Sequence, residues 1–164
     1  MNAGAAIRTA VFADVDAILD LIEAVTAEDE FLSGEVPLDR IAAGERYARR
    51  INNRKGIFFV AYADAELRGL IYVTAHPEYG DMLSMAIAKA HRGAGLGTRL
   101  MRSVVDWAHE RRLGALALLV FAHNAAAIAL YRKFGFIEIA RYPRDVIRSS
   151  GKVWDTLLMR LELP

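Results

Sequence analysis

Hydrophobic and polar positions follow two different periods along the chain, and the changes between them mark the expected helices and strands. Residues 15–25 carry apolar side chains at helical spacing, after acidic residues that suit a helix N-terminus. Residues 38–51 repeat this spacing, with Pro37 at the first helical position. Residues 57–62 and 67–74 are typical of two strands joined by a short polar hairpin connection.

The second half of the chain continues to alternate between strands and helices. Residues 82–88 form the next expected strand, and a glycine-rich turn leads from it into an amphipathic helix that Gly114 would cap. Residues 116–121 are a near-continuous apolar run, as expected of a strand covered on both faces. A helix over 125–134 and two last strands, around a loop that contains Pro143, complete a mixed sheet with helices on its faces.

Length and composition favour one domain that binds small molecules. The chain has 164 residues, of which 54% are hydrophobic, so we expect a single domain over 1–164 with one well-filled core. The net charge of +1 gives no support for a nucleic-acid or membrane surface, so we expect neither as a partner. The absence of cysteine excludes disulfides and thiolate catalysis and fits a cytoplasmic protein, and the first residues lack the pattern of a secretion signal.

The segment from His91 to Thr98 holds the strongest chemical signal, because small residues stand between a strand and a helix start. Backbone N–H groups can converge there on an anion without interference from side chains. A Walker-type phosphate loop would need a lysine before Thr98, which is absent. The dinucleotide pattern G-x-G-x-x-G would place Thr98 where a third glycine belongs, so a nucleotide-dependent oxidoreductase is the weaker alternative.

The pattern Arg92-x-x-Gly95-x-Gly97 fits without a gap, and it resembles the pyrophosphate-binding motif of the GNAT superfamily of acyl-CoA-dependent N-acyltransferases. A second stretch, Asn124 to Phe136, resembles the family pattern N-x-x-A-x-x-x-Y-x-x-x-G-F. The order of the expected elements is also similar from end to end. The resemblance implies an α/β (α+β) fold with a central mixed, mostly antiparallel sheet and helices on both faces.

The resemblance also implies acetyl-CoA as co-substrate and assigns residues to it. Strand residues Met85 and Ile87 would pair their backbone with the pantetheine arm, and Asn124 would contact the pantetheine or pyrophosphate region. Tyr131 would act as the catalytic general acid. The CoA pyrophosphate would be held by the backbone of Arg92, Gly93, Ala94, Gly95, Leu96, Gly97 and Thr98.

The chemistry of acetyl transfer supports the role of Tyr131 and leaves the base open. Aminolysis of a thioester expels a thiolate whose thiol has a pKa of roughly 8.5, and a phenol near about 10 stays protonated until needed. The attacking amine must be neutral, so a base or a water chain is required. Residues that are candidates for the base or for contact with the acceptor are Glu28, Glu30, Asp81, Ser84 and His123.

The expected reaction is direct transfer of the acetyl group to a primary amine within a ternary complex. Two segments, residues 26–31 and 141–152, are expected to line the acceptor side. A zinc motif that begins at His109 has leucine in place of its second histidine, so no metal is expected. An acyl-CoA-binding sensor without turnover is the alternative outside the enzymes, and the C-terminal strands suggest a possible homodimer.

Overall fold

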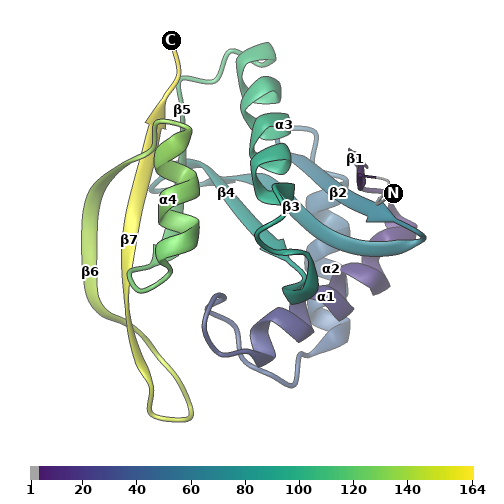
Figure 1. Ribbon diagram of the computed structural model, residues 1–164, viewed down its shortest axis with the longest axis horizontal. Coiled ribbons are helices and arrows are strands. Elements are labelled where there is room, and N and C mark those ends of the chain that lie inside the picture. The colour runs from purple at the N-terminus through teal and green to yellow at the C-terminus, as the bar shows by residue number, and fades with distance from the viewer. Residues whose placement is uncertain (1–3) are drawn as a thin grey trace.

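A seven-stranded sheet runs through the molecule in the order β1-β2-β3-β4-β5-β7-β6 (Figure 1). The computed structural model describes residues 4–164. Strands β4 and β5 are parallel, and the other neighbours are antiparallel. This confirms the expected mixed, mostly antiparallel sheet. The strands are β1 (Ala6–Thr9), β2 (Ile57–Ala63), β3 (Glu66–His76), β4 (Gly80–Ile87), β5 (Ala115–Phe121), β6 (Ile137–Ile147) and β7 (Val153–Glu162).

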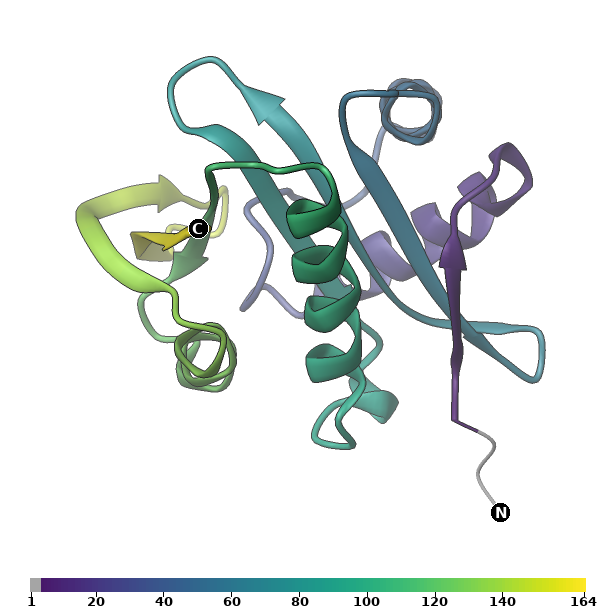
Figure 2. The same cartoon turned by 90° about the horizontal axis from the view of Figure 1, so that it is seen from above.

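Helices cover both faces of this sheet, as Figure 2 shows from above. Helices α1 (Val15–Ala27) and α2 (Arg40–Ile51) pack on one face. Helices α3 (Leu96–Glu110) and α4 (Ala125–Lys133) lie on the other. Each face buries its own apolar cluster, so the central strands are covered from both sides. No helix within residues 4–164 is long and apolar enough to cross a membrane.

The start of α2 differs from the expected one. Pro37 does not enter the helix, which begins at Arg40. Asp39 caps it instead, since its Oδ1 accepts a hydrogen bond from the Ala42 N–H at 3.0 Å. A carboxylate at this position satisfies one of the N–H groups that the helix leaves unpaired, which proline cannot do.

Two further predictions were wrong, one for the end of α3 and one for the position of Pro143. Helix α3 ends at Glu110, and the left-handed residue after it is Arg112, with φ 55°, rather than Gly114. The Leu113 N–H then donates to the Ala108 carbonyl at 3.0 Å, which closes the helix end. Pro143 lies inside β6, not in a loop. This strand forms the edge of the sheet, where a residue without an N–H is tolerated.

Strands β4 and β5 diverge almost as soon as they meet. They pair at one register, Met82 with Ala117. Beyond Met82, β4 keeps its ladder with β3 but pairs with no strand on its other side among residues 4–164. A gap therefore opens in the middle of the sheet, at the carboxyl ends of the two parallel strands.

A buried carboxylate ties the first strand to the first helix. Asp14 accepts hydrogen bonds from both Nη atoms of Arg8, at 2.7 and 2.8 Å, from the Val11 N–H and from the Tyr62 hydroxyl. The hydrogen bonds from Arg8 outweigh the effect of burial and lower the pKa of Asp14 below its ordinary value. The charged form of Asp14 is thus the one that stabilises the fold.

Replacing Asp14 should therefore weaken the fold in a pH-dependent way. We expect Asp14→Asn to lower the free energy of unfolding at pH 7 by about 1.5–3 kcal/mol, as for hydrogen bonds to a charged group. Because the folded pKa is depressed, this stabilisation is present above about pH 4 and is lost as the pH falls further. Urea unfolding at pH 7 and pH 3 measures it. The exposed Asp16→Asn is the control, and an equal loss in both variants would contradict the assignment.

Candidate active site

A cavity of about 920 Å³ occupies the gap between β4 and β5. One end is lined by the glycine turn and helix α4. The other end is lined by the α1–α2 loop and by strands β6 and β7. Strands β4 and β5 form the walls between the two ends. A single hollow thus connects the expected CoA-binding turn to the segments expected on the acceptor side.

The glycine turn presents backbone donors to one end of this cavity. Gly93 and Gly95 have φ values of 74° and 84°, in the left-handed region that other residues rarely adopt. An added Cβ at either glycine would meet no atom within 4 Å, so the turn is open on its outer side. Helix α3 begins at Leu96, and the N–H groups of its first turn lie beyond the reach of the helical ladder. They can bind an anion, which the helix dipole also favours.

Gly97 serves a different purpose from the other two glycines. An added Cβ there would lie 2.9 Å from Leu130 and 3.2 Å from Ile87. The absence of a side chain lets the start of α3 approach both α4 and β4. Gly97 therefore brings the turn, the free edge of β4 and helix α4 together around one space.

The free edge of β4 carries the two residues expected to pair with pantetheine. The Ala88 N–H donates to the Arg68 carbonyl of the neighbouring segment at 2.9 Å. Because backbone groups alternate along a strand, the N–H groups of Met85 and Ile87 point the opposite way, into the gap. The Ile87 carbonyl accepts a hydrogen bond from Arg92 Nε at 2.9 Å, whereas Met85 can both donate and accept.

Helix α4 contributes Asn124 and Tyr131 to the cavity lining. Asn124 caps the helix, with its Oδ1 accepting from the Ala127 N–H at 3.2 Å. The ring of Tyr131 packs against Phe136, and the residue is 7% exposed. Burial raises the pKa of Tyr131 to about 12. The phenol therefore remains protonated across the neutral range and can act as a proton donor.

The side chain of Arg92 binds the protein itself. Its two Nη atoms donate to the Glu28 carboxylate at 2.8 and 2.6 Å, and its guanidinium lies 4.6 Å from the centre of the Phe31 ring. This hydrogen bonding lowers the pKa of Glu28. Glu28 is thus held as a carboxylate partner of Arg92 rather than poised to take a proton, and the pair joins the α1–α2 loop to the glycine turn.

His123 and Glu30, both candidates for the base, contact each other outside the cavity lining. His123 Nε2 lies 2.9 Å from the Glu30 carbonyl oxygen and 3.3 Å from Glu30 Oε2. The His123 ring packs on Trp154, with 4.2 Å between ring centres. The cavity is lined by Ser84 but not by Asp81. Ser84 is therefore the one base candidate that reaches the cavity among the residues described.

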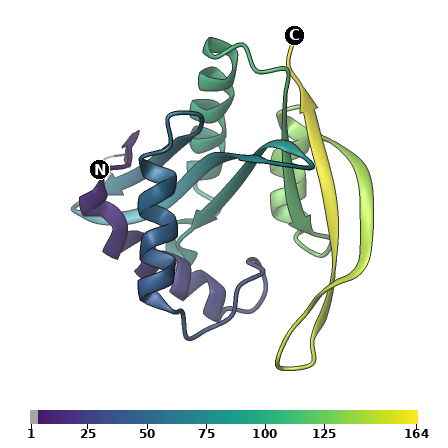
Figure 3. The same ribbon diagram turned by 180° about the vertical axis from the view of Figure 1, so that it is seen from behind.

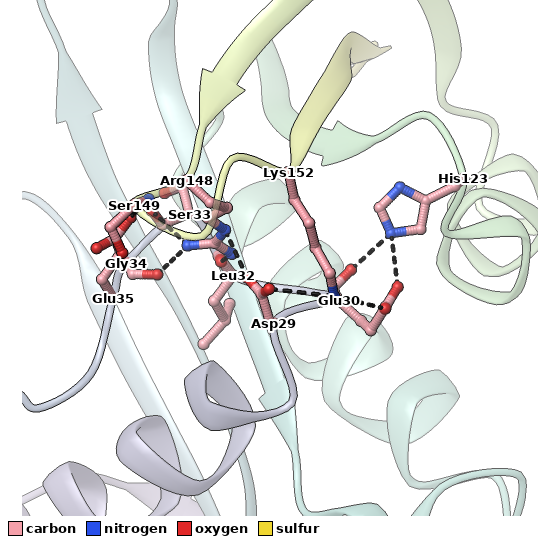
Figure 4. Close-up of polar contacts among 10 residues, drawn as sticks. All are labelled: Asp29, Glu30, Leu32, Ser33, Gly34, Glu35, His123, Arg148, Ser149 and Lys152. Atoms are coloured by element: carbon pink, nitrogen blue, oxygen red, sulfur yellow. Dashed lines mark hydrogen bonds and ion pairs between the residues drawn. The ribbon is translucent and has the colours of Figure 1, made fainter.

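The tip of the β6–β7 hairpin holds the α1–α2 loop in place, and Figure 3 shows the two segments from behind. Arg148, which is 4% exposed, donates to the carbonyls of Leu32, Ser33 and Gly34. Its Nε lies 2.8 Å from Asp29 Oδ1 (Figure 4). We call these contacts the Arg148 clamp. The clamp fixes the loop that carries Phe31 and Leu32 into the cavity wall.

Several cavity residues were not singled out from the sequence. Leu119 lies in the apolar run expected to be covered on both faces, yet it is 43% exposed because it faces the cavity. Asp145 and Val146 lie within the segment 141–152 that was expected on the acceptor side, but no motif marked them. Arg148 contacts residues more than 110 positions away, and no local pattern can indicate such a contact.

The described residues, 4–164, contain no group of three or more histidine, cysteine, aspartate or glutamate side chains placed to hold a metal ion. The lining of the cavity offers backbone donors, Tyr131 and a few polar side chains.

Comparison with known proteins agrees with this geometry. The chain is 34% identical over 85 residues to the uncharacterized N-acetyltransferase YobR of Bacillus subtilis, covering 52% of this chain and 34% of that protein. It is 26% identical to the L-methionine sulfoximine/L-methionine sulfone acetyltransferase of Pseudomonas aeruginosa, over 97% of this chain and 95% of the relative. It thus spans about a third of the length of one relative and nearly all of the other.

Solved structures give the same fold. The ribosomal-protein-alanine N-acetyltransferase of Brucella melitensis superposes with a TM-score of 0.86 at 26% identity, over 96% of this chain and 99% of that one. The family model described as Acetyltransferase (GNAT) family matches residues 20–136, which include the glycine turn and the Asn124 to Phe136 stretch. The chain belongs to the GNAT family of acetyltransferases.

Proposed function

We propose that this protein transfers the acetyl group of acetyl-CoA to a primary amine. Two sets of backbone groups that lack partners in the protein border the same cavity, and this observation carries the proposal. The first N–H groups of α3 suit the pyrophosphate, and the free edge of β4 suits the amide-bearing pantetheine arm. A long ligand with an anionic end and an amide-rich arm would contact both arrays along one cavity.

The residues present fit acetyl-CoA, which supplies an acetyl group activated as a thioester. The turn from Gly93 to Thr98 binds its phosphates through backbone donors, so side-chain charge is not required there. The backbone of Met85 and Ile87 orients the arm by strand-like pairing. Asn124 lines the same end of the cavity with its Oδ1 engaged in capping, which leaves its amide group to donate.

Tyr131 supplies the proton that the reaction needs at sulfur. In the transfer, a C–N bond to the amine forms, the C–S bond breaks and the amine releases a proton. The Tyr131 hydroxyl, at the cavity wall, delivers a proton to the departing thiolate and regains one from solvent. Both substrates are bound together, so the acetyl group passes directly to the amine without an enzyme-bound acetyl group.

The experiment that tests this proposal compares ligands on the purified protein. Acetyl-CoA and CoA should each raise the unfolding temperature, because a ligand at 100 times its dissociation constant stabilises the native state by about 2.7 kcal/mol. NAD and ATP serve as comparison ligands, and a shift with NAD alone would favour an oxidoreductase. Release of free thiol with amines, including L-methionine sulfoximine and alanine-ended peptides, then separates an enzyme from an acyl-CoA sensor.

A further inference from the structure

The cavity end away from the glycine turn combines apolar walls with a single carboxylate. Among the cavity-lining residues of the described chain, Asp145 is the only acidic one. The apolar walls around this end come from Phe31, Leu32, Leu119, Phe121 and Val146. Asp145 itself is exposed, so its carboxylate borders this end of the cavity where the cavity meets solvent. A carboxylate beside apolar side chains favours a ligand that combines a positive charge with an apolar body.

Asp145 is oriented but not neutralised. Its Oδ2 accepts a hydrogen bond from the buried Thr156 hydroxyl at 2.6 Å, which fixes the carboxylate on the cavity side of the hairpin. No ion pair formed within residues 4–164 includes Asp145. Its remaining oxygen, Oδ1, is therefore available to a ligand.

The other carboxylates near the acceptor side are already engaged. Glu28 pairs with Arg92, and Asp29 pairs with Arg148 and with Lys152. Glu30 lies 3.3 Å from His123 and 3.7 Å from Lys152. The acidic loop therefore stabilises the walls of the site, and the negative charge that faces the cavity comes from the hairpin.

Positive charge is correspondingly scarce at this end of the cavity. Arg92 uses all three of its nitrogens on Glu28 and the Ile87 carbonyl. Lys133 lies at the end of α4, on the side of the glycine turn. Arg148 is committed to the clamp. Among the described residues that line the cavity, Arg92 and Lys133 are the only cationic ones, so the lining of the acceptor end has no cation for a carboxylate of the acceptor.

From this asymmetry we propose that Asp145 binds the ammonium group of the acceptor, and that the acceptor is a primary amine with an apolar body and no carboxylate. The inference rests on the proposed acetyltransferase function and narrows its substrate class. Asp145 acts as a specificity-determining residue: it attracts the protonated amine, which transfers its proton to water before attack. A free α-amino acid would bring its own carboxylate close to the carboxylate of Asp145. The repulsion between the two negative charges would weaken its binding.

The test uses acceptors that share one side chain and differ in charge. The probes are 2-phenylethylamine, L-phenylalaninamide and L-phenylalanine. Cadaverine and L-lysine form a second pair, in case the site is too narrow for an aromatic ring. We expect kcat/KM for the amines and the amide to exceed that for the free amino acids at least tenfold. Asp145→Asn keeps an oxygen for Thr156 but removes the charge. It should lower kcat/KM for the amines at least tenfold, mainly through KM, with the acetyl-CoA dissociation constant unchanged.

The control is Glu138→Gln, which removes an exposed carboxylate of β6 that does not line the cavity and should stay within twofold of the wild type. Equal activity of Asp145→Asn and wild type, or a preference for the free amino acids, would overturn the inference. So would failure of every amine probe to be acetylated, or to shift unfolding of the CoA-bound protein, although acetyl-CoA binds. Failure to bind acetyl-CoA at all would instead overturn the proposed function.

Discussion

Tyr131→Phe is expected to lower kcat by about 100- to 10,000-fold, the usual contribution of a general acid. The substitution removes one oxygen from a ring that packs against Phe136 and leaves the packing unchanged. Acetyl-CoA should therefore bind with a dissociation constant within twofold of the wild type. Thiol release with a saturating amine gives kcat, and calorimetric titration gives the affinity.

The pH dependence provides a second check on Tyr131. A general acid must be protonated, and burial raises the pKa of Tyr131 to about 12, so the wild-type rate should not fall between pH 8 and pH 10 through this group. Tyr79→Phe, on the β3–β4 turn, is the control and should keep full activity. A Tyr131→Phe variant with wild-type kcat would exclude Tyr131 as the proton donor.

Arg148→Met is expected to lower the free energy of unfolding by about 2–4 kcal/mol. The variant leaves the carbonyls of the α1–α2 loop and the Asp29 carboxylate without their buried cationic partner, and breaking such a pair costs about 3–5 kcal/mol when both groups are fully buried. Asp29 keeps some contact with solvent and with Lys152, which reduces the cost. Urea unfolding measures the change.

Arg148→Met should also weaken binding of the amine without weakening binding of acetyl-CoA. Because the Arg148 clamp holds the wall that carries Phe31 and Leu32, KM for the amine should rise while acetyl-CoA affinity stays within about threefold. Arg148→Lys keeps a positive charge near Asp29 but loses the forked donors of the guanidinium. Its KM for the amine should lie between those of Arg148→Met and the wild type. The exposed Arg141→Met is the control. An unchanged amine KM in Arg148→Met would mean that the clamp does not shape the acceptor site.

Local patterns in the sequence predicted most of the elements and one end of the cavity. The glycine turn and the Asn124 to Phe136 stretch are contiguous, so their spacing alone carried the family resemblance, which the family match confirms. The predicted helix boundaries were wrong where two nearby residues could each serve as the helix cap. Asp39 rather than Pro37 precedes the start of α2, and Arg112 rather than Gly114 adopts the left-handed conformation after α3.

The acceptor end was less accessible to sequence reasoning because its parts are far apart in the chain. The pairs Glu28 with Arg92 and Asp29 with Arg148 join segments separated by 64 and more residues. The sequence indicated that the acidic loop faces the acceptor, but it contained no sign that these acids are neutralised by partners from other elements. Tertiary packing decides which carboxylate remains without an ion-pair partner. Asp145 could therefore be identified from the structure but not from the sequence.

The single register at which β4 meets β5 has a mechanical consequence. A central strand is ordinarily the most protected part of a sheet, because both of its edges are hydrogen-bonded. Here the amides of Met85 and Ile87 lie mid-sheet and yet face an open gap, so they should exchange hydrogen with solvent as fast as those of an outer strand. Little backbone pairing joins the two halves of the sheet, and a ligand that pairs with β4 in the gap would add hydrogen bonds between them.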